Sequence, residues 1–183
     1  KGEIILCFQP AEEIVQGALA MIDDGLFDDY HPERVLGLHI WNQLPSGFVG
    51  VNDSAVFASA DAFSLEVKGR GGHGALPHLN VDPIVAASQI ITNAQTIVSR
   101  EISPQDPGVL TFGKIESGSA PNIIPDSVSI EGTIRAYSQD VRERIYSSLE
   151  RISKLSAESM RSSATTEIMY GAGPVVNEQE VAS

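Results

Sequence analysis

Two adjacent glutamates, Glu12 and Glu13, follow the short apolar run Glu3–Phe8 (EIILCF). A run of this length is typical of a buried parallel strand, and ligands of α/β proteins bind at the carboxyl ends of such strands. Neighbouring carboxylates point in different directions, so one can bind a metal ion while the other faces the metal-bound water as a base. The alternative is a pair of solvated glutamates near a helix N-terminus, where the helix dipole favours negative charge.

An imidazole, His39, lies inside a second apolar run, Val35–Ile40 (VLGLHI). Neutral imidazole is a preferred ligand of zinc-like ions, and the end of a strand is a rigid place to hold it. The alternative is a core histidine whose ring is hydrogen-bonded to a backbone carbonyl. The pattern therefore makes His39 a candidate metal ligand.

A glycine-rich loop, Gly69–Gly74, carries the imidazole of His73. The loop lacks the Lys-Ser/Thr pair of a P-loop and the spacing of a dinucleotide-binding fingerprint, so phosphate binding has little support. The alternative to a site residue is a hairpin-like connection with a surface histidine. We expect His31 and His78 to be surface histidines.

Asn122 and Arg135 lie thirteen residues apart, on a predicted loop and the neighbouring strand. A planar guanidinium holds a carboxylate through two hydrogen bonds, so Arg135 is a candidate for binding an acidic group of a substrate. The alternative is a surface arginine and a turn-forming asparagine.

A strand, a helix and a second strand are predicted in the first part of the chain, over Glu3–Phe8, Gly17–Asp24 and Val35–Ile40. Gly25 follows the helix as its predicted C-cap. Cys7, inside the first predicted strand, is expected in the core. This order indicates a piece of an α/β domain that is too short to be a complete doubly wound fold.

From about Ala58 onward the pattern changes to the order β-α-β-β-α-β, which predicts a ferredoxin-like α/β sandwich with a four-stranded antiparallel sheet and two helices. Asp82 is the predicted N-cap of the first helix, which runs to about Arg100. The predicted strands are residues 62–68, 109–115, 127–137 and 165–170, and the second helix is residues 140–160. The predicted apolar faces consist of Ile84, Ala87, Ile91 and Ala94 on the first helix and of Val141, Ile145, Leu149, Ile152 and Leu155 on the second.

The 183 residues include 12 basic and 24 acidic side chains, a formal net charge of −12. This acidity argues against nucleic-acid binding, which needs clustered Lys and Arg to neutralise phosphates. No apolar run approaches the roughly 20 residues of a membrane span, so we expect no membrane partner. Cys7 is the only cysteine, which excludes an internal disulfide and fits a reducing compartment, so we expect a cytoplasmic protein. Because Lys1 is not a start methionine, we expect an internal fragment of a longer protein.

Four motifs occur in a fixed order along the chain: FQPAEE (Phe8–Glu13), GALAMIDDG (Gly17–Gly25), GLHIW with LPSG (Gly37–Gly47), and GRGGHGALPH (Gly69–His78) followed by Asp-Pro. Together they resemble the aminoacylase, hippurate hydrolase and auxin-conjugate hydrolase family of co-catalytic metallopeptidases. The resemblance covers nearly the whole chain. It implies metal-dependent hydrolysis of the amide bond of N-acyl amino acids or small peptides.

The resemblance also implies roles for individual residues. Glu12 would be the general base, and Glu13 and His39 would each bind a metal. Asn122 and Arg135 would bind the carboxylate end of the substrate. Two divalent metal ions would complete the site, with zinc expected and manganese, cobalt or nickel as alternatives.

The resemblance further implies a homodimer paired through the second domain, in which His73 reaches the partner's active site and polarises the scissile carbonyl. The family's upstream Cys-Gly-His-Asp segment and its C-terminal histidine are missing from this sequence, so we expect the chain alone to be inactive. The expected domains are a partial catalytic domain (1–57), a dimerisation domain (58–170) and a return segment (171–183). The alternative is a non-catalytic dimerisation module or a truncated paralogue. The acyl group and the preferred amino acid stay open.

Overall fold

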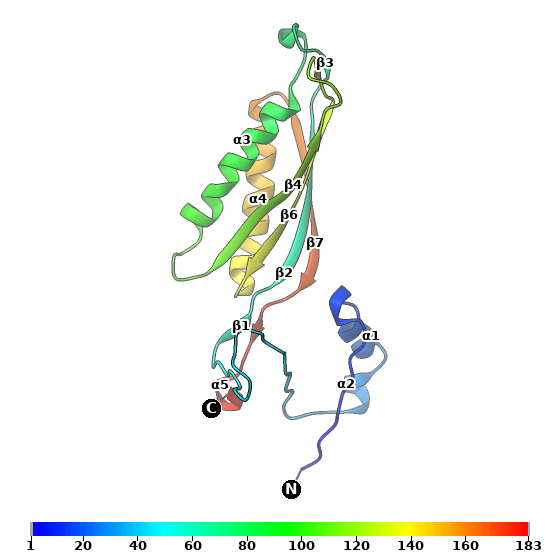
Figure 1. Ribbon diagram of the computed structural model, residues 1–183, viewed down its shortest axis with the longest axis vertical. Coiled ribbons are helices and arrows are strands. Elements are labelled where there is room, and N and C mark those ends of the chain that lie inside the picture. The colour runs from blue at the N-terminus through cyan, green and yellow to red at the C-terminus, as the bar shows by residue number, and fades with distance from the viewer. Residues whose placement is uncertain (1, 183) are drawn as a thin grey trace. The chain divides into compact units, whose positions relative to one another are not determined.

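The computed structural model of the protein describes residues 2–182, and the chain divides into two compact units. One unit consists of the residues up to Val51 together with those from Gln179 onward, and the other is Asn52–Glu178. Figure 1 shows the elements of both units. Within the residues covered, no helix is long and apolar enough to cross a membrane.

The second unit is built on four antiparallel strands in the order β4-β6-β2-β7. Both long helices, α3 (Pro83–Thr96) and α4 (Gln139–Ser159), cover the same face of this sheet (Figure 1). The order β2-α3-β4-β6-α4-β7 confirms the predicted ferredoxin-like sandwich. The strands are β2 (Ala60–Lys68), β4 (Gly108–Ser117), β6 (Ser127–Ala136) and β7 (Ser163–Ala172).

Alternation along the strands decides which side chains enter the core. In β2, Phe63, Leu65 and Val67 are buried, and the residues between them are less so. In β6, every second residue from Val128 to Ala136 is buried. A period of two is what a sheet with only one covered face requires. The helices complete the core with Ala86, Ala87, Ile90 and Ala94 from α3 and with Val141, Ile145, Leu149 and Ile152 from α4.

Side-chain caps mark the starts of both helices. Asp82 caps α3, since its Oδ1 accepts a hydrogen bond from Ile84 N at 2.9 Å. Ser138 caps α4 in the same way, because its Oγ accepts from Val141 N at 3.3 Å. The predicted N-cap of α3 is therefore confirmed. The C-terminal end of α3 continues as a π-helical turn, Ile97–Glu101.

The predicted apolar faces of the helices are wrong at two positions, Ile84 and Leu155. Ile84 is 45% exposed and Leu155 is 55% exposed. The buried stripe of α3 begins at Pro83, and Ile84 lies about 100° further round the helix, away from the sheet. On α4 the four-residue step from Ile152 falls on Ser156, which is buried in place of Leu155.

A short two-stranded ribbon closes each end of the sandwich. At one end, β3 (Gly72–His73) pairs with β5 (Ile123–Ile124), next to the 3-10 turn Pro77–Leu79. At the other end, β1 (Ala55–Phe57) pairs antiparallel with β8 (Val175–Val176), so the chain enters and leaves the sandwich side by side (Figure 1).

The first unit contains short helical elements. A 3-10 turn, Glu12–Ile14, precedes α1 (Gly17–Asp23). Gly25 follows α1 with a φ of 94°, the left-handed conformation that a helix-terminating glycine adopts, in agreement with the prediction. Helix α2 (Leu26–Asp29) comes next, and α5 (Gln179–Ala182) lies at the end of the chain.

The two strands predicted in the first unit are wrong, because neither Glu3–Phe8 nor Val35–Ile40 has β-structure. Leu38 is 90% exposed, and Cys7 is also exposed, so the expected core position of Cys7 is wrong as well. A strand needs neighbouring strands to pair its backbone N–H and C=O groups. Among the described residues of this unit there is no such neighbour. An apolar run favours burial but does not supply that partner.

Candidate active site

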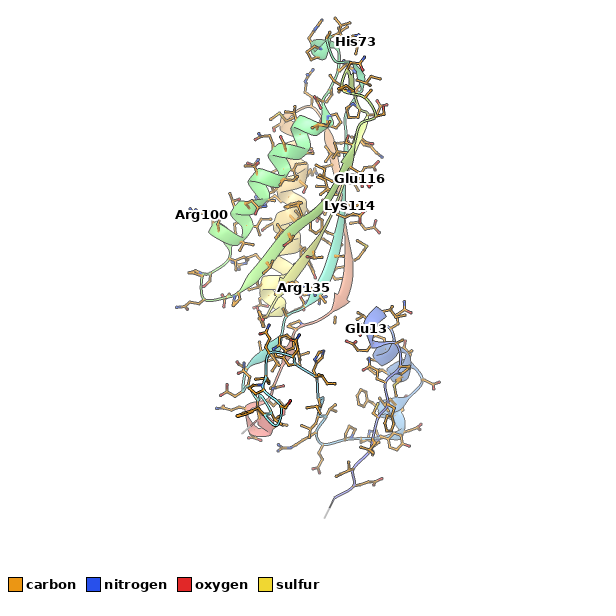
Figure 2. All side chains as sticks on the ribbon, in the orientation of Figure 1. Glu13, His73, Arg100, Lys114, Glu116 and Arg135 are labelled. Carbon is orange, nitrogen blue, oxygen red and sulfur yellow. The ribbon has the colours of Figure 1, made fainter. Side chains whose placement is uncertain are left out.

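Glu12 and Glu13 lie on a tightly folded turn. Ala11 and Val15 flank them with φ angles of 53° and 57°, and Val15 N donates to Glu12 O at 2.8 Å. The left-handed conformation is a genuine outlier for a β-branched residue such as Val15. Strained backbone of this kind clusters at functional sites, because it aims side chains that a relaxed loop would not hold. Both glutamates are exposed, and Figure 2 labels Glu13.

The ring of His39 is oriented by its own backbone. Its Nδ1 lies 2.6 Å from the carbonyl oxygen of Ile40. A carbonyl only accepts, so Nδ1 carries the proton and donates, which places the lone pair of the neutral ring on Nε2. A metal-binding histidine has this arrangement, with one nitrogen held by a backbone carbonyl. Because His39 is exposed, the alternative of a core histidine is wrong.

The fit of this unit to a metal centre is incomplete. A two-metal hydrolase site needs about five ligands from the protein. In residues 2–182, no three His, Cys, Asp or Glu side chains lie close enough to hold an ion together. Glu13 and His39 are suitable in type, but the described residues do not build a metal cage by themselves.

His73 and Asn122 meet at the tip of the sandwich in the second unit. His73 pairs with Ile123 in the β3–β5 ribbon, and Gly74 N donates to Asn122 O at 2.8 Å. The ring Nδ1 of His73 accepts a hydrogen bond from Ala75 N at 3.1 Å. Both side chains are exposed, and Figure 2 shows His73 at the extreme end of the unit. The structure thus brings together two of the predicted site residues.

The glycines of this loop allow close backbone packing. A Cβ atom at Gly71 would lie 2.6 Å from the carbonyl oxygen of Ile124, closer than any side chain tolerates. Gly71 N donates to Asp126 Oδ1 at 2.9 Å, and Gly69 N donates to the backbone oxygen of Asp126 at 2.8 Å. These hydrogen bonds anchor the loop to the residue that precedes β6.

Arg135 lies at the opposite end of the same sheet from His73 (Figure 2). It pairs with Val109 at the start of β4, and its Nη1 donates to Ser59 O at 3.4 Å. Eight residues of β6 separate Ser127 from Arg135, which at about 3.3 Å per residue is about 26 Å. Within one chain, Arg135 and Asn122 therefore cannot contact the same carboxylate.

A buried ion pair supports the Arg135 end of the sandwich. Arg142 donates from Nη2 to Asp61 Oδ1 at 2.5 Å and from Nε to Asp61 Oδ2 at 2.9 Å. Gly171 N donates to the same carboxylate at 2.9 Å. Burial alone raises the pKa of Asp61, but the hydrogen bonds from Arg142, Tyr146 and Gly171 outweigh it and hold that pKa below its ordinary value.

Sequence reasoning missed the residues that hold these side chains in place. Asp126 follows a proline just before a predicted strand. This composition is typical of turns, and it is the sequence signal that could have pointed to Asp126. Asp61 and Arg142 are 81 residues apart, so no local pattern links them.

Comparison with known proteins identifies the second unit. Residues 59–160, more than half of the chain, match the M20 family of peptidase dimerisation domains. The chain belongs to this family. The match confirms the metallopeptidase family that the motifs indicated. The matched residues form the ferredoxin-like sandwich described above.

Two curated relatives are similar to the M20 chain along nearly its whole length. The N-acetyl-L-cysteine deacetylase of Bacillus subtilis (strain 168) is 39% identical over 99% of the chain and 43% of the relative. The N-acyl-L-amino acid amidohydrolase of Geobacillus stearothermophilus is 37% identical over 98% of the chain and 48% of the relative. The M20 chain thus spans less than half the length of these relatives.

Solved structures share the fold. A protein from methicillin-resistant Staphylococcus aureus superposes with a TM-score of 0.88 at 35% identity, over 95% of the M20 chain and 44% of its own. A Bacillus subtilis protein described as a dinuclear metal binding peptidase of the M20 family superposes with a TM-score of 0.77 at 27% identity, over 96% of the M20 chain and 43% of its own.

Proposed function

We propose that this chain is part of a metal-dependent amidohydrolase that cleaves the amide bond of N-acyl amino acids. Its relatives carry the names of a deacetylase and an amidohydrolase, and a structural neighbour is described as a dinuclear metal binding peptidase. Glu13 and His39 are two of the proposed metal ligands, and zinc is the proposed metal. The metal centre would act as the Lewis acid of the reaction.

The observation that carries the proposal is the presentation of His73. Its Nδ1 accepts from Ala75 N, so the neutral ring carries its proton on Nε2. An exposed imidazole N–H on an anchored tip can donate a hydrogen bond to the oxygen of a substrate carbonyl as negative charge develops there. Glu12 would take the proton of the attacking water and return it to the departing amine.

The charge distribution of the helices favours a homodimer. Helix α4 exposes charged residues along its outer face, namely Glu143, Arg144, Glu150, Arg151 and Lys154. Helix α3 has no charged residue, and its outer face exposes Ile84, Val85, Ser88 and Thr92. Depletion of charge is typical of the centre of an interface between proteins. Strand β4 is an edge of the sheet, with backbone groups that a second strand can pair.

A homodimer resolves the separation between Asn122 and Arg135. Asn122 lies beside His73 at the tip, so if the tip serves the partner's active site, both residues do. One substrate carboxylate would then be held by Arg135 of one subunit and Asn122 of the other.

Subunit mixing in the full-length parent enzyme tests this assignment. Inactive Glu12→Gln and His73→Ala subunits should restore activity on mixing, because each heterodimer holds one site with an intact base and an intact histidine. Asn122→Ala and Arg135→Ala subunits should complement in the same way. Activity is measured against mixing ratio after confirmed subunit exchange.

The matched control is a mixture of Asn122→Ala and His73→Ala subunits. Both residues belong to the same tip, so every site in the heterodimer lacks one of them and mixing should restore nothing. A flat line for all three mixtures would mean that the tip serves its own subunit or has no role.

A non-catalytic dimerisation module is the second candidate, favoured by the incomplete set of metal ligands in residues 2–182. We propose that the chain by itself dimerises and hydrolyses nothing. A panel of acetyl, benzoyl and indole-acetyl amino acids, tested with metal analysis on the full-length parent and on this chain, separates the two candidates. Hydrolysis by neither protein would leave only the module.

A further inference from the structure

Asn80 is a buried polar residue at the base of the His73 loop. It is 7% exposed, and its Nδ2 donates to Leu76 O at 3.0 Å and to His73 O at 3.5 Å. A buried amide at this position links two carbonyls of the loop through a single side chain. The side chain thus spans the turn that follows His73.

The neighbouring backbone is shaped around this amide. A Cβ atom at Gly72 would lie 2.3 Å from Asn80 Oδ1, so the glycine leaves the space that the amide occupies. Asn80 N donates to Pro77 O at 3.1 Å, and Arg70 Nη2 donates to Leu79 O at 2.8 Å. Side-chain and backbone hydrogen bonds together close the turn from both sides.

The closed turn determines which nitrogen of His73 carries the proton. Leu76 N donates to His73 O at 2.9 Å, and within this turn Ala75 N lies 3.1 Å from His73 Nδ1. A backbone N–H only donates, so Nδ1 must accept and the proton of the neutral ring resides on Nε2. If the turn opened, the Ala75 bond would be lost and both tautomers would become accessible.

We propose that Asn80 is a positioning residue that fixes His73 as an outward-facing Nε2–H donor. It contacts no reacting atom and acts only through the turn that orients the ring. The inference rests on the proposed function for its catalytic meaning, but its structural core concerns the loop alone.

The first test uses the 183-residue chain without any activity measurement. In Asn80→Asp the shape is kept, but a carboxylate cannot donate to the two carbonyls. The ¹⁵N spectrum of the His73 ring should change from a pure Nε2–H form to a mixture of tautomers, and the amide of Ala75 should lose protection from hydrogen exchange. His31 in the other unit serves as the internal reference, and His73→Gln assigns the signal.

The matched control is Asn93→Ala. Asn93 is a second asparagine of the same unit whose Nδ2 makes one side-chain hydrogen bond, to Ser156 Oγ at 3.0 Å, away from the loop. It should leave the His73 tautomer and the Ala75 amide unchanged. Asn80→Ala is the second variant, in case the aspartate unfolds the loop through its charge. An unchanged tautomer in both Asn80 variants would overturn the proposal.

The second test is a double-mutant cycle in the full-length parent. Asn80→Ala should lower kcat at least tenfold with little change in KM, and it should have no further effect in a His73→Ala background. Equal effects in both backgrounds would mean that Asn80 does not act through His73. If the parent lacks activity altogether, the proposed function fails, while the tautomer experiment still decides the role of Asn80.

Discussion

At the scale of single residues, Glu12 lies on a turn whose flanking residues have strained backbone conformations. The left-handed conformations of Ala11 and Val15 cost about 1–3 kcal/mol each and persist only when the surroundings enforce them. The close approach of Gly17 to Pro10 is part of that enforcement, because a Cβ at Gly17 would overlap the carbonyl oxygen of Pro10.

Replacing the proposed base should remove catalysis without removing metal. Glu12→Gln keeps the shape of the side chain but cannot take a proton, so kcat of the full-length parent should fall by about 10² or more. Metal content, measured by elemental analysis, should stay at the wild-type level. The control is Glu33→Gln, a change at another exposed glutamate of the same unit. It should alter neither the metal content nor kcat. Loss of metal from Glu12→Gln would instead make Glu12 a ligand.

The residue types of the candidate site could be predicted from the sequence, but their grouping could not. Asn122 and Arg135 lie thirteen residues apart in the sequence, and the extended strand between them carries Arg135 to the far end of the sheet. Asn80 gave no signal, because its role depends on carbonyls that only the folded turn brings within reach.

At the scale of elements, the start of α3 depends on its N-cap. Asp82 satisfies an N–H group that the first turn of the helix leaves without a partner. Asp82→Ala should therefore lower the free energy of unfolding by about 1 kcal/mol, measured by urea denaturation of the chain. Asp82→Asn retains the accepting oxygen and should cost only a small part of this. Equal losses in both variants would mean that charge rather than capping is responsible.

The two edge strands of the sheet allow a matched test of dimerisation. Thr111 on β4 and Thr165 on β7 are both exposed threonines on edge strands. Thr111→Lys places a charge at the proposed interface in each subunit and should shift the chain toward monomer in sedimentation or light scattering. Thr165→Lys should leave the dimer intact. If Thr165→Lys dissociates the dimer and Thr111→Lys does not, the interface lies at β7 instead of β4.

Elements of the second unit could be predicted because each carries its own signal. Alternation in β2, the Asp82 cap and the four-residue steps of α4 are local properties that survive in the fold. Glu3–Phe8 and Val35–Ile40 have the apolar composition of buried strands, but strand formation depends on neighbours that composition does not specify.

At the scale of the molecule, the Asp61–Arg142 pair ties together three separate parts of the second unit. Asp61 lies in β2, Arg142 in α4 and Gly171 in β7, and both charged side chains are almost fully buried. Arg142 also lies over the rings of Tyr146 and Tyr170, with its guanidinium carbon 5.7 and 5.8 Å from their centroids. Breaking the pair leaves a buried charge without a partner.

Arg142→Met should lower the free energy of unfolding by about 3–5 kcal/mol at neutral pH. Arg151→Met is the control, because it removes an exposed pair with Glu101, 2.7 Å apart, and should cost less than about 1 kcal/mol. Denaturant titrations of the two variants and the wild type give the comparison. Equal costs would show that burial of the Asp61 pair contributes nothing.

The same pair predicts a pH dependence with a definite sign. The pKa of Asp61 is lower in the folded state, so its contribution to stability is fully present above its unfolded pKa of about 3.9. The contribution is lost as the pH falls through the folded-state pKa. The stability difference between wild type and Arg142→Met should therefore shrink below about pH 4. A difference that stays constant into that acidic range would contradict the assignment.

The pairing of β1 with β8 brings both ends of the sandwich to one place, with Ala55 opposite Val176. When the two ends of a unit lie close together, the unit can be inserted into a surface loop of a host protein without separating the residues on either side of the insertion point. The two ends of this unit therefore meet the geometric requirement for joining another domain as one continuous segment. Residues 52–178 are accordingly the segment to express alone, because the β1–β8 ribbon pairs its two ends with each other.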